Sequence, residues 1–281
     1  MTDLPVRVHS LHLHPVKSCA GVDVTEALVI ETGLELDRAW MVVDAQGRFL
    51  SQRELPRLAL VRPTLKHAEM VLRAPGMLAL HVALDAVEEA TRAMLWGESL
   101  AAYDMGALSA QWFSDFLGQQ VRLVRFDPEQ RRMTDPAGSG EAAWHDVQAL
   151  HVTTLQSLDD FNQRLVERGE APVTMARFRP NLVLDAPGLQ DDALDELVFP
   201  SEQGTVRLKV VMPCERCAIV DVDPLTGVRG DAVLRTLAAN QAPGRVGDVS
   251  LGDYVAIVDG IDAVLRAGAS GMAERRDAGA A

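Results

Sequence analysis

The sequence has few cysteines and no long apolar runs. Its 281 residues include only Cys19, Cys214 and Cys217 as cysteines. An odd and sparse set of this kind argues against a disulfide framework and for a reducing compartment. No run of 18 apolar residues occurs, and residues 1–7 lack the basic and apolar segments of a signal peptide. These absences predict a globular protein of the cytoplasm with no membrane span.

Positive charge is also scarce. Lys and Arg number 27 against 40 Asp and Glu, which gives a formal net charge of −13. Such an acidic surface repels nucleic-acid backbones and anionic lipid, so neither is expected as a partner. The chain also lacks a Gly-x-Gly-x-x-Gly or Gly-Lys-Ser/Thr phosphate loop and a Gly-x-Ser-x-Gly elbow. The usual nucleotide-binding and serine-hydrolase motifs are therefore not found.

Hydrophobic residues make up 48% of the chain, enough for a substantial core. The first part shows short apolar or alternating runs separated by turns, a pattern typical of antiparallel or barrel-like β-structure. We expect strands at residues 6–13, 27–30, 39–43, 58–61, 70–73 and 78–83. A helix is then predicted from the apolar spacing of residues 108–117, ending at Gly118.

The second part predicts more strands with two helices among them. A polar loop is expected at residues 127–140, and helices at residues 154–168 and 231–239. Strands are expected at residues 121–126, 150–153, 181–184, 206–211, 218–222 and 254–258. The pattern predicts a mainly β (α+β) protein of two units, residues 1–120 and 121–262, followed by a flexible tail at 263–281.

The tetrapeptide Cys214-Glu215-Arg216-Cys217 allows several interpretations. Half of a zinc site would need a second ligand pair, which the sequence does not supply, and the strand histidines His12 and His14 have no third ligand nearby. A thioredoxin-like redox pair would need a helix after the motif. One thiolate presented to a soft metal beside Arg216 remains open, as does a pair of unreactive cysteines.

Basic residues of this acidic chain gather at expected strand ends and loops. They are Lys17, Arg38, Arg53, Arg177, Arg179 and Arg216. Gathered around a thiolate, such side chains would form an anion pocket suited to a phosphate-bearing cofactor. Taken one at a time, each is better explained as a solvated surface charge.

Two sets of segments carry a resemblance to a known family. His14-Pro15-Val16-Lys17-Ser18-Cys19, Leu36-Asp37-Arg38-Ala39-Trp40 and Ser51-Gln52-Arg53 resemble the N-terminal β-barrel domain of the MOSC superfamily. Arg177-Phe178-Arg179-Pro180-Asn181, Pro213-Cys214-Glu215-Arg216-Cys217 and residues 221–227 resemble the MOSC domain. The likeness runs in register from about residue 9 to residue 258. Within the superfamily, the chain is most similar to the amidoxime-reducing component family and its bacterial homologues.

The resemblance implies an N-terminal β-barrel-like domain packed on a MOSC β-barrel domain, and a molybdenum cofactor (Mo-molybdopterin). Cys217 would be the metal ligand and the catalytic centre, whereas Cys214 would not bind the metal. The pterin and its phosphate would be held by Lys17, Ser18, Arg38 and Arg179. Further cofactor contacts would come from Arg53, Asp146, Val147, Asn181, Glu215 and Arg216. The superfamily also carries an association with pyridoxal phosphate binding.

The family implies reduction of N-hydroxylated compounds, such as hydroxylamines, amidoximes and N-hydroxylated bases, to the parent amine or amidine. Electrons would come from a separate flavin, haem or iron–sulfur protein. A second interpretation is a carrier that binds the molybdenum cofactor, or its sulfur, without turnover. A third is a β protein with buried cysteines and no cofactor.

Overall fold

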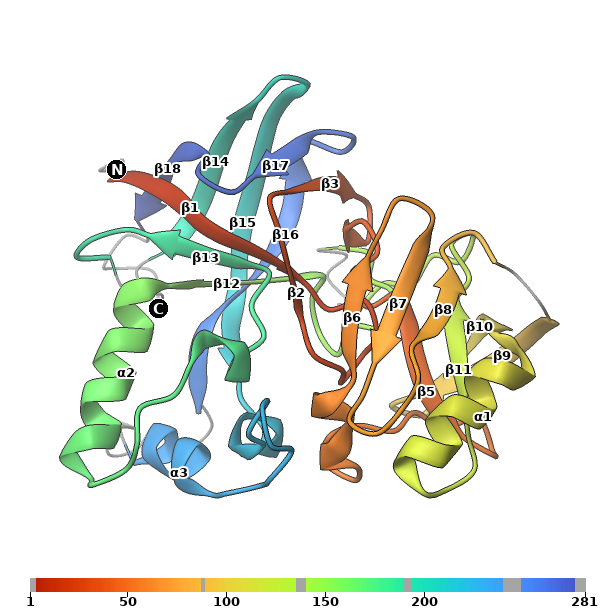
Figure 1. Cartoon of the computed structure of the whole chain (residues 1–281). Helices are drawn as coiled ribbons and strands as arrows, with labels where there is room; N and C mark the ends of the chain where they lie inside the picture. The colour runs from red at the N-terminus through yellow and green to blue at the C-terminus, as the bar shows by residue number, and fades with distance from the viewer. Residues whose placement is uncertain (1–3, 87–88, 135–139, 190–193, 240–248, 276–281) are drawn as a thin grey trace.

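The computed structural model describes residues 4–86, 89–134, 140–189, 194–239 and 249–275. Strands dominate the described chain and helices are few, which confirms the expected mainly β fold. Two lobes lie side by side (Figure 1). One is built around the long strands of the second half of the sequence, and the other around the short strands of the first half.

The larger lobe is a closed barrel of seven strands. The strands are β1 (Leu4–Leu13), β12 (Leu150–Thr154), β13 (Leu182–Asp185), β14 (Leu194–Ser201), β15 (Gly204–Glu215), β16 (Ser250–Asp259) and β18 (Ser270–Arg275). Their order is β13-β12-β16-β15-β14-β18-β1, and a further β1–β13 pairing closes the ring. Alternate residues along β15 are buried, as a strand with one face on a core requires. Val8, Leu11, Leu182, Leu208 and Val255 belong to the core of this lobe.

Helices cover one end of the barrel. The predicted helix at 154–168 is observed as α2 (Leu155–Glu167), where the Thr154 side chain accepts a hydrogen bond from the Ser157 N–H. It connects the parallel strands β12 and β13. α3 (Ala232–Ala238) lies near it, and the two helices share a small apolar core that includes Phe161, Phe178 and Val220.

The smaller lobe contains two antiparallel sheets and a helix. One sheet has the order β5 (Trp40–Asp44), β11 (Val121–Phe126), β10 (Glu98–Asp104) and β9 (Glu89–Leu95), and the other joins β6 (Arg62–Leu65), β7 (Glu69–Arg73) and β8 (Leu80–Ala83). α1 (Gly106–Leu117) ends at Gly118, whose φ of 74° is the left-handed conformation expected there. Four short strands remain. β2 (Val22–Val24) pairs with β1, and β3 (Glu26–Ile30) pairs with β4 (Gly33–Leu34) and β17 (Val264–Arg266).

Strand pairing crosses the predicted boundary at residues 120 and 121. β1, from the start of the chain, is a member of the larger barrel, where it pairs with β13 and β18. β11, predicted to open the second unit, pairs with β5 and β10 of the smaller lobe. Each lobe therefore contains a strand from the other predicted unit.

Two predicted strands are wrong. Of the predicted strand at 58–61, residues 58–60 lie in a 3-10 turn, Pro56–Leu60, because Pro56 at its start favours a turn over a strand. Residues 218–222 also begin as a 3-10 turn, Ala218–Asp221. There the Asp221 carboxylate accepts hydrogen bonds from the Val233 and Leu234 N–H groups at the start of α3, which fixes the turn.

The flexible tail predicted for residues 263–281 is wrong as far as residue 275. Residues 264–266 and 270–275 form β17 and β18. The small residues of β18 suggested a frayed end, but a Cβ on Gly271 would lie 2.4 Å from Phe199 Cδ1, so smallness there permits close packing. Residues 276–281 lie outside the described chain. No described helix has the length and apolar character needed to cross a membrane.

Candidate functional site

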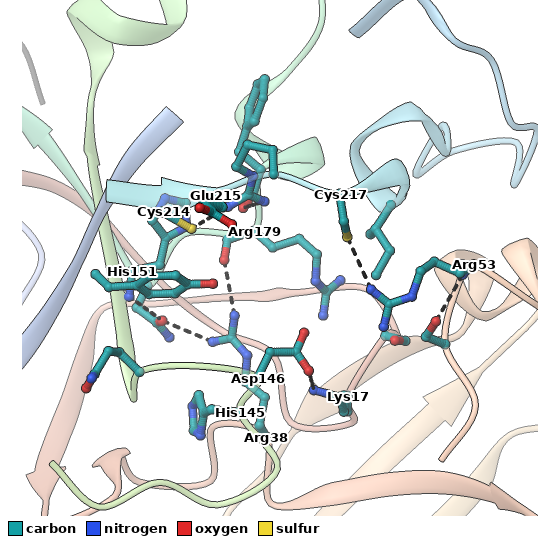
Figure 2. Close-up of a pocket in the computed structure, with 18 residues that line it drawn as sticks. Lys17, Arg38, Arg53, His145, Asp146, His151, Arg179, Cys214, Glu215 and Cys217 are labelled. Atoms are coloured by element: carbon teal, nitrogen blue, oxygen red, sulfur yellow. Dashed lines mark hydrogen bonds and ion pairs between the residues drawn. The ribbon is translucent and has the colours of Figure 1, made fainter. Parts of the chain in front are cut away.

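A pocket between the lobes collects ten of the eleven site residues predicted from the sequence (Figure 2). They are Lys17, Ser18, Arg38, Arg53, Asp146, Arg179, Asn181, Glu215, Arg216 and Cys217. Val147 follows Asp146 but does not line the pocket. Five of the lining side chains are cationic and two are carboxylates, so the pocket is locally basic although the chain carries a charge of −13.

The two cysteines of the Cys-x-x-Cys motif occupy different environments. Cys217 follows β15 at the start of a 3-10 turn and is exposed, whereas Cys214 is buried. Arg53 Nη1 lies 3.4 Å from Cys217 Sγ, and Arg216 Nη1 lies 2.7 Å from Cys214 Sγ. Of the two thiols, only that of Cys217 is presented openly to a ligand in the pocket.

Arg53 is positioned by contacts at both ends. The Arg229 guanidinium donates hydrogen bonds to the backbone carbonyls of Gln52 and Arg53. The Arg53 guanidinium stacks 4.8 Å from the centre of the Trp96 ring, and Phe49 packs edge-on against Trp96 at 4.7 Å. These contacts hold the positive charge beside Cys217.

Lys17 and Asp146 form a pair on the opposite wall. Lys17 Nζ donates to Asp146 Oδ1 and to the Trp144 carbonyl, both at 2.6 Å. Trp96 Nε1 donates to the same carboxylate oxygen at 2.9 Å. Burial alone would raise the pKa of Asp146, but the charge and hydrogen bond of Lys17, together with Trp96, lower it to about 2. Asp146 is therefore ionised at neutral pH.

Asp37 lies behind the pocket and organises three of its residues. Its carboxylate accepts hydrogen bonds from Arg38, from Asn181 Nδ2 at 2.9 Å and from His145 Nε2 at 3.0 Å. Arg38 Nη1 also donates to Asn181 Oδ1 at 3.0 Å. Burial would raise the pKa of Asp37, but Arg38 and His145 hold it well below its usual range. A buried, ionised Asp37 thus keeps Arg38 and Asn181 in place.

Arg179 is a further cationic residue of the pocket. Its guanidinium donates to the Cys19 carbonyl. Burial and the charge of Arg38 lower the pKa of Arg179 to about 10, so the side chain remains protonated at pH 7. The positive charges of Arg38 and Arg179 therefore face the same pocket, where they favour a negatively charged ligand.

The backbone is strained at three of the predicted residues. Ser18, Arg38 and Arg179 have φ values of 67°, 48° and 57°, in the left-handed region that non-glycine residues rarely adopt. Strain of this kind persists only where surrounding structure enforces it, and it gathers at ligand-binding sites. All three residues line the same pocket.

Comparison with known proteins identifies the family. Residues 5–120 match the MOSC N-terminal beta barrel domain and residues 139–262 match the MOSC domain. The mitochondrial amidoxime reducing component 2 of Rattus norvegicus is 35% identical over 237 residues, which are 79% of this chain and 68% of that protein. The chain belongs to the amidoxime-reducing component family. The human mitochondrial amidoxime-reducing component 1 is 34% identical, over 79% of this chain and 67% of its own length.

A second group of MOSC-domain relatives is more distant. The human molybdenum cofactor sulfurase is 29% identical over 259 residues. The match covers 84% of this chain but 29% of the sulfurase.

Sequence reasoning missed several residues that line or support the pocket. Trp96 stands at the turn between β9 and β10, 50 residues before Asp146, and no motif marks it. Asp37 stands in the segment 36–40 that carries the family resemblance, but no role was assigned to it. For His145, the only available signal was its position next to Asp146. Tyr254 lines the pocket beside Cys214. Burial and then Cys214 raise the pKa of its phenol, so Tyr254 is protonated at neutral pH.

A multi-ligand metal site finds no support within the described residues. No group of three or more His, Cys, Asp or Glu side chains there is placed to hold a metal ion. His12 binds Asp23 and Ser10, and His14 contacts the Pro180 carbonyl. The pocket therefore offers a ligand one accessible thiol, together with many hydrogen-bond donors that suit an anion.

Proposed function

We propose that this chain is a molybdenum-cofactor-dependent oxidoreductase that reduces N-hydroxylated compounds. The observation that carries the proposal is the exposed Cys217 thiol in a pocket with five cationic side chains. A thiolate is a soft ligand that suits molybdenum, and Arg and Lys side chains suit a phosphate. Membership of the amidoxime-reducing component family supports the same reaction class.

Unpaired polar atoms in the pocket fit such a cofactor. Arg53 Nη2 and Arg216 Nε are buried donors without a partner. Because a carboxylate only accepts, the hydrogen of His145 lies on Nε2, which contacts Asp37, and burial lowers the His145 pKa so that the ring is neutral. His145 Nδ1 is then a buried acceptor without a partner. A phosphate would use the donors, and a pterin N–H would use the acceptor.

The enclosed part of the pocket is small, about 110 Å³. Arginine side chains occupy much of the space between the lobes, as Figure 2 shows for Arg38, Arg53 and Arg179. A pterin is larger than this volume, so a bound cofactor would have to displace part of these side chains from their present contacts. Their guanidinium groups would then turn from protein carbonyls to cofactor oxygens.

The residues divide into roles by their surroundings. Cys217 would bind the metal. Lys17, Ser18, Arg38 and Arg179 would hold the pterin and its phosphate, with Asn181 fixing Arg38. Asp146, Glu215 and Arg216 would contact the pterin, and Arg53 would stand beside the thiolate. Val147 lies outside the lining, so any contact it makes would be through its backbone.

The proposed reaction consumes two electrons and two protons per substrate. The N–O bond breaks, and the parent amine or amidine and one water molecule leave. When bound, the molybdenum cofactor supplies the two-electron chemistry that breaks this bond. The chain's own residues bind and orient the cofactor and keep positive charge beside it. We propose that electrons arrive from a separate electron-transfer protein, and that the protein works in the cytoplasm.

Pyridoxal phosphate fits these residues poorly. Its chemistry needs a lysine amine free to bond the cofactor. The chain has three lysines. Lys17 is paired with Asp146, Lys66 with Glu69, and Lys209 with Asp195. We therefore derive no function from pyridoxal phosphate.

The alternative is a protein that carries the molybdenum cofactor, or its sulfur, without turnover. The likeness to the molybdenum cofactor sulfurase favours this alternative, because the match includes both MOSC domains. The same pocket residues would serve a carrier. The two functions differ in whether a bound cofactor turns over substrate.

A dye-driven assay separates them. Cofactor-loaded protein is mixed with reduced methyl viologen and benzamidoxime, and benzamidine is measured by chromatography. The enzyme predicts one benzamidine for every two dye molecules oxidised, with repeated turnovers. Bound molybdenum with no benzamidine above a heat-treated control would contradict the enzyme and leave the carrier.

A further inference from the structure

A second and larger cavity lies between the two lobes. Its volume is about 650 Å³, within the range of small-molecule sites. Residues 62–64 of the smaller lobe line it, together with residues 174–177 and 222–225 of the larger lobe. It shares Arg179 and Ile219 with the first pocket, but Cys217 does not line it. The proposed reaction assigns no role to this cavity.

The charged residues that line the cavity leave an excess of positive charge. Three of them are arginines, Arg62, Arg177 and Arg179, and one is acidic, Asp23. The Asp23 carboxylate is bound by His12 Nδ1 at 2.7 Å. Arg177 has a carboxylate partner at 2.9 Å in Asp223, which stands outside the lining. Arg179 belongs to the first pocket as well, so Arg62 is the cation particular to this cavity.

Arg62 lies next to a second arginine. It stands on β6 directly opposite Arg73 of β7, and both residues are exposed. Like charges directly opposite each other in an antiparallel pair are destabilising. Neither arginine forms an ion pair with a carboxylate of the described chain, although the sequence has 40 acidic residues against 27 Lys and Arg. The paired arginines therefore favour an anion as a partner from outside the chain.

The rest of the lining is largely apolar. It comes from Ala59, Pro63, Met175, Pro180, Ile219, Val222, Pro224 and Leu225. Leu225 is 69% exposed, and its N–H donates to Asp223 Oδ1 at 2.9 Å, which fixes the turn that carries it. An exposed aliphatic side chain on a fixed turn offers a contact to an apolar ligand.

We propose that this cavity binds an organic anion with an apolar body, of the aryl or alkyl carboxylate class. The ligand carboxylate accepts hydrogen bonds from the Arg62 guanidinium, with the charge of Arg73 beside it. The apolar body packs against Met175 and Leu225 between the lobes. The site needs neither a metal nor electrons, so it is independent of the proposed reductase function.

The probe is 2-naphthoate, and Met175 is the reporter within the lining. Protein labelled with ¹³C-methyl methionine is titrated while the Met175 resonance, assigned with Met175→Leu, is followed by NMR. We expect a saturable shift with a Kd on the order of 0.1 mM, as for a ligand of this size. 2-Naphthamide has the same shape without the charge, and it should bind about tenfold more weakly.

Replacing Arg62 tests the source of this preference. Arg62→Gln should weaken 2-naphthoate binding about tenfold and leave 2-naphthamide binding unchanged, because only the acid uses the positive charge. Arg92→Gln is the matched control, since Arg92 is another exposed arginine of the smaller lobe, bonds to Ser99 and lies outside the lining. It should bind both probes as the wild type does.

Replacing Leu225 tests the apolar part of the site. Leu225→Ser should weaken the binding of both probes at least threefold, because each loses the same apolar contact. Val228→Ser is the control: Val228 is 65% exposed on the same turn and does not line the cavity. Thermal melting checks that the variants fold, which the exposure of all the replaced side chains favours.

Three results would overturn the proposal. One is the absence of a Met175 shift when the wild type is titrated with 2-naphthoate. Another is equally tight binding of 2-naphthamide, which would mean that the arginines do not select an anion. The third is unchanged 2-naphthoate binding by folded Arg62→Gln. Since the comparison of acid and amide uses the wild type alone, it decides the charge preference even if a variant fails to fold.

Discussion

Arg53 Nη1 lies 3.4 Å from Cys217 Sγ, although 164 residues separate them in the sequence. Arg53 belongs to the smaller lobe, and Cys217 follows β15 of the larger one. The contact therefore exists only when both lobes are folded and joined. It places a permanent positive charge beside the one exposed cysteine of the chain.

Replacing Arg53 tests whether the cationic side chains of the pocket hold the cofactor. Arg53→Met keeps an unbranched apolar stem but removes the charged donor, and hydrogen bonds of charged groups contribute about 1.5–3 kcal/mol. We expect the variant to lose bound molybdenum at least tenfold faster during dialysis, measured by elemental analysis. Arg48→Met is the control, because Arg48 pairs with Asp44 outside the pocket. Equal loss from both variants would contradict a role for Arg53 in holding the cofactor.

Trp96 is expected to act by positioning Arg53 and Asp146. The side chain is 55% exposed, so its removal should change the melting temperature little. Trp96→Ala loses both the stack with Arg53 and the hydrogen bond to Asp146. We expect kcat in the dye-driven assay to fall about tenfold, which corresponds to a rise of about 1.4 kcal/mol in the activation free energy. Trp96→Phe keeps the stack, so its kcat should fall less. Leu108→Ala, at another exposed site, is the control; identical rates in all four proteins would rule out positioning by Trp96.

Asp37 is expected to be a large contributor to stability. Its side chain is fully buried and pairs with Arg38, Asn181 and His145. Asp37→Asn leaves the Arg38 charge without its partner, so urea unfolding should show a loss of about 3–5 kcal/mol. Glu26→Gln breaks an exposed pair with Arg266 and should cost under about 1 kcal/mol. A similar small loss in both variants would be evidence against the buried network.

The low pKa of Asp146 predicts a specific pH dependence of the unfolding free energy. Its folded pKa of about 2 lies below the usual value of 3.8. A depressed carboxyl pKa stabilises the fold above the unfolded pKa, and this contribution is lost as the pH falls from about 4 toward 2. Asp146→Asn should therefore show a shallower loss of unfolding free energy over that interval than the wild type. The Asp146 side chain is 36% exposed, so the difference will be modest. Parallel stability curves would contradict the Lys17–Asp146 pairing.

Local patterns in the sequence were sufficient for part of the fold. The apolar spacing that ends at Gly118 and Gly169 predicted α1 and α2, and alternation predicted β1. Strands whose register depends on distant partners were harder. β18 is built of small and polar residues and exists because it fits between β14 and β1, which local periodicity does not reveal.

The site was predictable where motifs lie in order along the chain. Lys17, Arg38, Arg179 and Cys217 were identified through family resemblance, and the structure brings them into one pocket. Trp96 was not identifiable, because it contacts Arg53 and Asp146 from a hairpin turn with no motif around it.

The central claim is that the Cys217 thiolate binds the molybdenum of the cofactor. We would express the protein and two variants, Cys217→Ala and Cys19→Ala, in a host that makes the cofactor, and measure molybdenum and pterin per chain. Cys19 is a suitable control because it is buried and lies outside the pocket lining, and burial raises its pKa to about 12. The account predicts close to one molybdenum per chain in the wild type and Cys19→Ala, and a large loss in Cys217→Ala. Absence of both molybdenum and pterin from the wild type, or full retention of molybdenum by Cys217→Ala, would contradict it.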